Sequence, residues 1–216
     1  MKQIFVVRHG ETDFNRQQRI QGRGIDASLN DRGKEQARLV KDALEPEPIE
    51  RVIVSSLRRT HETAKPLVLA KGLAVEGYQD LDEISFGNLE GRPFNDIKPM
   101  VMDLHTKWSS GQVDVRVDGG ESPTEVFERA HTKALEIIEM ASEEHLLFVL
   151  HGRLIRILLS EWLGLGLKNM HEIAHTNGSI NKLVFEKGRF EAVYLNKTEH
   201  LNGQQSQIFQ KENTQA

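Results

Sequence analysis

Ile4-Phe5-Val6-Val7-Arg8-His9-Gly10 is the stretch of sequence that decides the fold, because four apolar residues lead directly into an arginine, a histidine and a glycine. A short run of β-branched and aromatic residues is typical of a buried strand. The glycine that follows would let the backbone come close to an anion. The stretch therefore predicts a buried strand whose carboxyl end delivers a cation and an imidazole to one place.

Two other apolar runs end in the same way. Arg51–Val54 leads into Ser55-Ser56-Leu57-Arg58-Arg59, and Leu146–Leu150 leads into His151-Gly152-Arg153. Ligands of open α/β sheets bind beyond the carboxyl ends of the strands. We therefore expect the three sets of polar residues to meet at one edge of a sheet. Ordinary solvated surface residues would not explain why three separate strands end in this way.

Helical patterns lie between these strands. Asp31–Leu44 has apolar residues at helical spacing. Ser122-Pro123-Thr124-Glu125 combines a capping box with a proline in the first turn, and it predicts a helix that runs to about Ala141. Leu154–Leu163 is apolar nearly all round and predicts a buried helix.

The last third of the chain adds a predicted hairpin. Ser179–Phe185 and Arg189–Leu195 have strand character and flank a turn at Lys187-Gly188. Strands separated by helices predict an α/β fold with a largely parallel sheet. We therefore expect a three-layer α/β/α sandwich with a mixed, mostly parallel central sheet.

Composition limits the remaining possibilities. The 216 residues suit one domain, which we expect over 1–196 with a cap-like insertion at about 92–118 and a polar tail over 197–216. The absence of cysteine excludes disulfides and a cysteine nucleophile. With 28 basic and 32 acidic residues, and without an apolar run of membrane-spanning length, we expect neither nucleic acid nor membrane as partner, and a cytoplasmic location.

Arginine and histidine gathered at one sheet edge suit phosphoryl transfer. The arginine fork binds phosphate oxygens bidentately. An imidazole can act as nucleophile or proton carrier near neutral pH. Because positioning and charge neutralisation supply most of the catalysis in phosphoryl transfer, the expected partner is a small phosphate ester.

Five segments in order resemble the signature of the histidine phosphatase superfamily, the phosphoglycerate mutase-like proteins. An Arg-His-Gly triplet alone would be weak evidence, but the ordered set, which spans about residues 3 to 185, is specific. The resemblance implies the phosphoglycerate mutase-like fold and the phosphatase branch of the family. The matching segments are Arg8-His9-Gly10-Glu11-Thr12 with Asn15 and Gln21-Gly22, then Ser55–Ala64, Leu81–Gly91, Gly119–Ser122 and His151-Gly152.

The resemblance implies a role for each matching residue. His9 is expected to be the nucleophile that takes the phosphoryl group, and Glu83 the general acid and then the base. Arg8, Arg59 and His151 are expected around the phosphoryl oxygens. No metal or other cofactor is expected, because arginine supplies the positive charge. The expected substrate-binding residues are Asn15, Gln21, Gly22 and Gly152.

Some assignments are choices between neighbours. The spacing to Thr63-Ala64 favours Arg59 over Arg58, which would then be solvated at a helix start. The Phe-Gly pair after Ser85 favours Glu83 as the acid, and Glu121 could instead serve a helix N-terminus. The other carboxylates that compete with Glu83 are Asp80, Asp82 and Glu90.

Other polar residues have two interpretations each. His61 would line the pocket rim or lie at the surface, and Arg153 would contact the substrate or begin a helix at the surface. Asn177-Gly178-Ser179 would close the phosphate site or only form a turn. His171 and His175 are four residues apart, which suits two metal ligands on a helix, but no third ligand is apparent.

Departures from the family pattern favour hydrolysis. Gly22–Leu29 has an extra residue, and Ser28 replaces a proline, so the pocket rim differs from the family pattern. The stretch from Glu83 to Gly119 lacks the glutamate-arginine-histidine-tyrosine-glycine segment associated with phosphoglycerate mutases, so a phosphomonoesterase is the first expectation.

Two other functions stay open. A bisphosphoglycerate-dependent phosphoglycerate mutase would use the same residues, with Arg23, Arg92, Lys98 and Arg116 as candidate carboxylate ligands. An inactive phospho-ligand-binding protein is the third reading, against which the complete catalytic set speaks. The apolar edge of the predicted hairpin would support a homodimer.

Overall fold

A six-stranded sheet lies at the centre of the computed structural model, which describes residues 1–202. The strand order is β3-β2-β4-β1-β5-β6. The first four of these strands pair in parallel, and the β5–β6 hairpin joins β1 in the antiparallel sense. The strands are β1 (Lys2–Arg8), β2 (Arg51–Ser55), β3 (Val75–Tyr78), β4 (His145–Leu150), β5 (Ile180–Glu186) and β6 (Arg189–Lys197).

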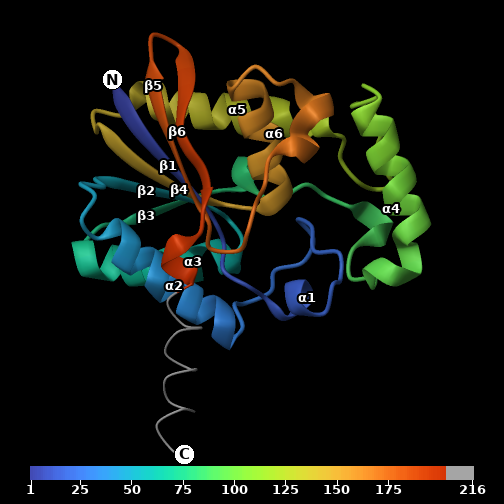
Figure 1. Ribbon diagram of the computed structural model, residues 1–216, viewed down its shortest axis with the longest axis horizontal. Helices are drawn as coiled ribbons and strands as arrows, with labels where there is room; N and C mark the ends of the chain where they lie inside the picture. Colours follow the sequence, from blue (N-terminus) through green and yellow to red (C-terminus); the bar gives the residue numbers. More distant parts are fainter. Residues whose placement is uncertain (203–216) are drawn as a thin grey trace, which may run out of the picture.

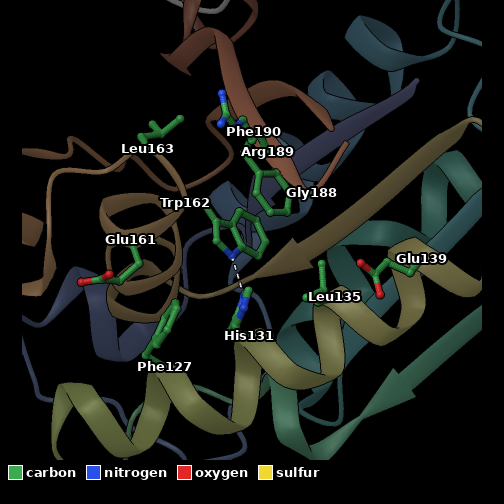
Figure 2. A pocket seen from close by; sticks show the side chains of 10 residues that line it. All are labelled: Phe127, His131, Leu135, Glu139, Glu161, Trp162, Leu163, Gly188, Arg189 and Phe190. Atoms are coloured by element: carbon green, nitrogen blue, oxygen red, sulfur yellow. Dashed lines mark hydrogen bonds between the residues drawn. The ribbon is translucent and has the colours of Figure 1, made fainter. Parts of the chain in front are cut away.

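Helices cover both faces of the sheet (Figure 1). Successive side chains of β1 alternate between the faces. Ile4 and Val6 pack with α5 (Pro123–Met140) and α6 (Gly152–Trp162), while Phe5 and Val7 pack with α2 (Asp31–Leu44) and α3 (Arg58–Lys71). The expected three-layer sandwich with a mostly parallel sheet is confirmed.

Helix α4 (Phe94–Ser109) lies at one side of the molecule, at the right in Figure 1. It falls within the insertion expected at about 92–118. Ile97 and Val101 belong to a small apolar cluster of their own, whereas Trp108 is fully buried in the main core. Trp108 is thus a core residue that anchors the C-terminal end of α4.

The predicted elements are present. Helix α3 was expected only at its start, and β3 and α4 were not predicted. The hairpin turns at Lys187 and Gly188, whose φ angles of 50° and 76° suit a tight primed turn. Strand β3 was missed because it has four residues and includes Gly77. Helix α4 was missed because Pro99 interrupts its pattern. Short turns complete the chain: α1 (Asp13–Arg16), η1 (Gln79–Leu81), η2 (Gly87–Leu89), η3 (Leu167–Glu172) and η4 (Glu199–Leu201).

Regular structure continues past residue 196, where the domain was expected to end. Strand β6 runs to Lys197, and in η4 the Nε2 of His200 donates to the carbonyl of Gly178 at 2.9 Å. The remainder of the expected tail, residues 203–216, lies outside the described residues. None of the helices within residues 1–202 has the length and apolar character needed to cross a membrane.

Candidate active site

The carboxyl ends of β1, β2 and β4 lie side by side, because β4 pairs with both of the other strands. His9 directly follows β1, and His151 directly follows β4. Their ring centres are 5.3 Å apart. The sheet therefore brings together the strand ends that the sequence analysis singled out.

His9 presents one free ring nitrogen. The residue is 3% exposed, and its Nδ1 lies 2.7 Å from the carbonyl oxygen of Gly10. A carbonyl only accepts, so Nδ1 carries the proton and Nε2 keeps its lone pair. Burial lowers the pKa of His9 well below 6.5, and the positive charges of Arg59 and Arg8 lower it further. His9 is thus neutral, with Nε2 available for attack.

His151 is held at both ring nitrogens. Its Nδ1 accepts from Nε of Arg59 at 3.1 Å, so its Nε2 carries the proton and donates to Oγ of Ser55 at 2.7 Å. Burial, followed by the charge of Arg59, lowers the pKa of His151 well below 6.5. The ring is therefore a fixed neutral group beside His9.

Arg59 is fully buried in the first turn of α3. Its Nη1 donates to the carbonyl of Ile25 at 2.7 Å and its Nη2 to that of Gly22 at 3.4 Å. Arg58 is exposed and donates to Oγ of Ser28 instead. Of the two neighbouring arginines, Arg59 is the one that enters the site, and it anchors the loop around Gly22.

Arg8 lies against Gly152. Its Nη1 donates to the carbonyl of His175 at 3.1 Å, and its buried Nε has no partner among residues 1–202. Burial lowers the pKa of Arg8 to about 10. A Cβ atom on Gly152 would lie 3.0 Å from this Nε and 2.9 Å from Cδ2 of His175. Glycine is required here because a side chain would displace the guanidinium.

Asn15 and Gln21 are joined through Thr12. The Thr12 hydroxyl donates to Oε1 of Gln21 at 2.8 Å, and its backbone N–H donates to Oδ1 of Asn15 at 3.1 Å. The amide of Asn177 donates to the carbonyl of His9 at 3.0 Å and to Asn15 at 3.3 Å. Nε2 of Gln21 is buried without a partner among the described residues. Asn177 thus helps to close the site.

Glu83 is 6% exposed and lies at the N-terminus of α6. Its Oε1 accepts from the backbone N–H of Ile84 at 3.0 Å and of Leu154 at 2.9 Å, and its Oε2 accepts from that of Arg153 at 3.0 Å. The first turn of α6 has no acidic residue of its own. Glu83 therefore supplies the negative group that a helix N-terminus favours, from a distant loop.

Arg129 on α5 holds the loop that carries Glu83, and the sequence analysis missed it. Its Nη1 donates to the carbonyls of Asp80 at 2.7 Å and Asp82 at 3.0 Å, and its Nη2 donates to that of Glu83 at 3.2 Å. The same guanidinium donates twice to Glu121, at 2.8 and 2.9 Å. Because most of its partners are backbone carbonyls, no residue pattern could have revealed this role.

Three of the carboxylates that compete with Glu83 have structural partners, and the fourth, Asp80, is exposed. Asp82 accepts from the backbone N–H and the hydroxyl of Ser56 at 2.9 and 2.8 Å. Glu90 accepts from the N–H of Phe86 at 3.0 Å. Glu121 directly precedes Ser122, the N-cap of α5, and it also accepts from Arg129. These contacts leave Glu83 as the best candidate for the acid.

The structure defines the surroundings of the polar residues that had two interpretations. His61 packs against Gly77 of β3, because a Cβ atom on Gly77 would lie 3.2 Å from its ring. Arg153 begins α6, but its side chain turns inward to His105 and His171, so the surface interpretation is wrong. Residues 1–202 contain no cluster of three or more His, Cys, Asp or Glu side chains that could hold a metal ion.

Four cations could bind the substrate carboxylate in a mutase, and two of them are paired with acidic residues while the other two are exposed. Arg23 donates to Glu121 at 3.4 Å and lies 3.6 Å from Asp82, and Arg116 pairs with Glu125. The side chains of Arg92 and Lys98 are exposed. Arg23 and Arg116 are thus bound to acidic residues of this chain.

Solved structures of phosphatases are similar to this chain. A mycobacterial glucosyl-3-phosphoglycerate phosphatase in complex with VO3 superposes with a TM-score of 0.83 and 26% identity, and the match covers 91% of this chain and 99% of that one. The alpha-ribazole phosphatase from Shigella flexneri superposes with a TM-score of 0.80 over 90% of this chain and 96% of that one. Its 22% identity supports the fold alone.

A curated relative is more similar in sequence. The probable phosphoglycerate mutase GpmB of Yersinia pestis (strain Pestoides F) is 33% identical over 187 residues, which are 87% of this chain and 86% of that protein. The histidine phosphatase superfamily (branch 1) matches residues 4–198, a range that takes in all three strand ends and Glu83. The chain therefore belongs to this superfamily of phosphoryl-transfer enzymes.

Proposed function

We propose that the protein is a metal-independent phosphomonoesterase that hydrolyses a small phosphorylated metabolite through a phosphohistidine on His9. The observation that carries the proposal is the tautomer of His9, which leaves Nε2 unprotonated in a buried ring that feels the positive charges of Arg59 and Arg8. Nε of Arg8 and Nε2 of Gln21 are buried donors without partners among the described residues, and phosphate oxygens would satisfy both.

The first half of the reaction transfers the phosphoryl group to His9. Nε2 attacks phosphorus, the bond from phosphorus to the leaving oxygen breaks, and protonated Glu83 gives its proton to that oxygen. Oε2 has one N–H partner against two for Oε1, so it is the oxygen with room for the proton.

The second half restores the enzyme. Glu83, now a carboxylate, takes a proton from water as the water oxygen attacks phosphorus. The bond from phosphorus to Nε2 breaks, which releases phosphate and neutral His9. Arg8, Arg59 and His151 would surround the transferred oxygens throughout, and their fixed contacts mean that little reorganisation is required.

A bisphosphoglycerate-dependent mutase is the second candidate, since a curated relative is named a probable phosphoglycerate mutase. The same nucleophile and acid would serve it, but the pocket would have to hold the intermediate and exclude water. The pairing of Arg23 and Arg116 with acidic residues leaves fewer cations for a carboxylate, which favours hydrolysis.

The test is hydrolysis of an aryl phosphate in the presence of EDTA by the wild type, by His9→Ala and by the control His145→Ala, which changes a histidine at the start of β4. We expect phosphate release that survives EDTA, disappears in His9→Ala and persists in the control. Mass spectrometry after a rapid quench should find the phosphoryl group on the peptide that contains His9.

Two results would contradict the proposal. Interconversion of phosphoglycerates in the presence of bisphosphoglycerate, without net phosphate release, would assign the protein as a mutase. Full activity of His9→Ala would exclude His9 as the nucleophile.

A further inference from the structure

Arg153 has an inward-turned guanidinium that the proposed reaction does not use. Its Nη1 donates to Nδ1 of His171 at 3.1 Å, and its Nη2 donates to Nε2 of His105 at 2.8 Å. The guanidinium also lies over the ring of Trp108, 5.4 Å from the ring centre. Helices α4 and α6 and segment η3 thus hold one cation in a fixed position.

The groups that hold Arg153 leave its charge uncompensated. An imidazole nitrogen that accepts a hydrogen bond is unprotonated, so His105 and His171 are both neutral here. Burial, followed by the charge of Arg153, lowers the pKa of His105 to about 3 and that of His171 to about 4. An arginine with a purely structural role would normally be paired with a carboxylate when it is buried.

Other cations on this side of the site also lack acidic partners. Burial lowers the pKa values of Arg8 and Arg153, and the nearby charge of Arg156 lowers both further. Arg156 itself donates to the carbonyl of Ile173 at 2.8 Å. Glu83 is the carboxylate whose charge acts on both Arg8 and Arg153. A phosphate dianion bound at His9 would offset the positive charge near that residue, but the charge of Arg153 would remain without an anionic partner.

The guanidinium of Arg153 has N–H donors that the described residues do not use. A guanidinium has five N–H groups, and the two imidazoles take two of them, while residues 1–202 provide no acceptor for the others. The backbone N–H of Arg153 binds Glu83, the group proposed to protonate the leaving oxygen. The leaving oxygen would therefore come close to the first turn of α6, which carries Arg153.

We propose that Arg153 is a specificity-determining residue that binds a second anionic group, a carboxylate or a second phosphate, on the alcohol part of the phosphate ester. This inference rests on the proposed function for the position of the leaving oxygen. The guanidinium fork binds either group with paired N–H donors. The neutral imidazoles keep the fork oriented without competing for its charge.

The test compares esters that differ only in the second group. 3-Phosphoglycerate and glycerol 3-phosphate form the carboxylate pair, and fructose 1,6-bisphosphate and fructose 6-phosphate form the phosphate pair. We expect the wild type to prefer one of the doubly anionic esters by at least about tenfold in kcat/KM, or about 1.4 kcal/mol. In Arg153→Gln the preference should vanish, because kcat/KM should fall at least about tenfold more for the doubly anionic ester than for its singly anionic counterpart.

Three further measurements make the result decisive. Arg153→Lys should keep part of the preference, because it retains the charge without the fork. Arg38→Gln, which changes an exposed arginine of α2, should keep all of it. Wild-type ratios near one for both pairs, or an equal loss on all esters in a folded Arg153→Gln, would overturn the inference.

Calorimetric binding of the same esters separates this inference from the proposed function. If no ester is hydrolysed, the proposed function fails. A binding preference that is lost in Arg153→Gln would still support the anion site, and equal binding within both pairs would reject it.

Discussion

Two buried donors at the site have no partner within residues 1–202, namely Nε of Arg8 and Nε2 of Gln21. A buried donor without an acceptor costs the folded state about 1–3 kcal/mol. Such a cost is expected where a site is built for a ligand rather than for stability, because the missing acceptors arrive with the substrate. Side-chain identity at these positions therefore reflects binding more than folding.

Gln21→Glu tests whether the unpartnered donor of Gln21 serves substrate binding rather than stability. The new carboxylate can still accept from the Thr12 hydroxyl, but it replaces a donor with an oxygen that repels phosphate. We expect kcat/KM to fall by at least about tenfold, with no loss of thermal stability. Gln17→Glu, at the exposed C-terminus of α1, is the control and should leave kcat/KM unchanged. A fall in melting temperature with unchanged kcat/KM would show that Gln21 is structural.

At the scale of elements, the sequence predicted what local patterns encode. The capping box at Ser122 and the apolar strands were found because their signals lie within a few residues. Helix α4 was missed although Ile97, Val101, Leu104 and Trp108 have helical spacing, because it contains Pro99, and proline is disfavoured inside helices. The ordered motifs located His9 and Glu83, whereas contacts such as those of Arg129 join distant segments and need the fold.

Arg129→Met tests the support of the loop that carries Glu83. The substitution removes the side-chain donor of three carbonyls and one of the donors of the Glu121 carboxylate. We expect a loss of about 2–4 kcal/mol in the free energy of unfolding, and a fall in kcat larger than the change in KM. Urea unfolding and steady-state kinetics measure both, with Arg38→Met on the surface of α2 as control. Unchanged kcat would mean that Glu83 is positioned by α6 alone.

Leu158→Ala tests the packing of α6 against the sheet. Leu158 is 1% exposed in the core cluster that includes Ile4 and Phe148, so its truncation should leave a cavity and cost about 2–5 kcal/mol. Leu69→Ala is a matched control, because Leu69 is 72% exposed on α3 and should change stability by less than about 0.5 kcal/mol. Below the unfolding transition, kcat/KM should be unchanged in both variants. Equal stability of the two would contradict the buried position of α6.

For the whole molecule, the net charge of the chain is negative, whereas the charge around the strand ends is positive. The chain has a formal charge of −4, but Arg8, Arg59 and Arg153 gather around the strand ends. Burial and these cations together keep several histidines neutral: the pKa values of His9, His151, His105, His171 and His175 are all lowered. Net charge alone therefore could not reveal the anion-binding character of the site.

These histidines make stability depend on pH. Their pKa values in the folded state lie below 6.5, their ordinary value, so the unfolded chain binds more protons as the pH falls through 6.5. Their contribution to stability is present above about pH 6.5 and is lost on acidification. We expect the melting temperature to fall steadily from pH 6.5 to 5, before the carboxylates titrate. The double variant His105→Asn/His171→Asn keeps two neutral acceptors for Arg153 that cannot be protonated, so its decline should be shallower. A melting temperature that is constant from pH 7.5 to 5, or an equal slope in the double variant, would show that these histidines bind protons in the folded state as readily as in the unfolded chain.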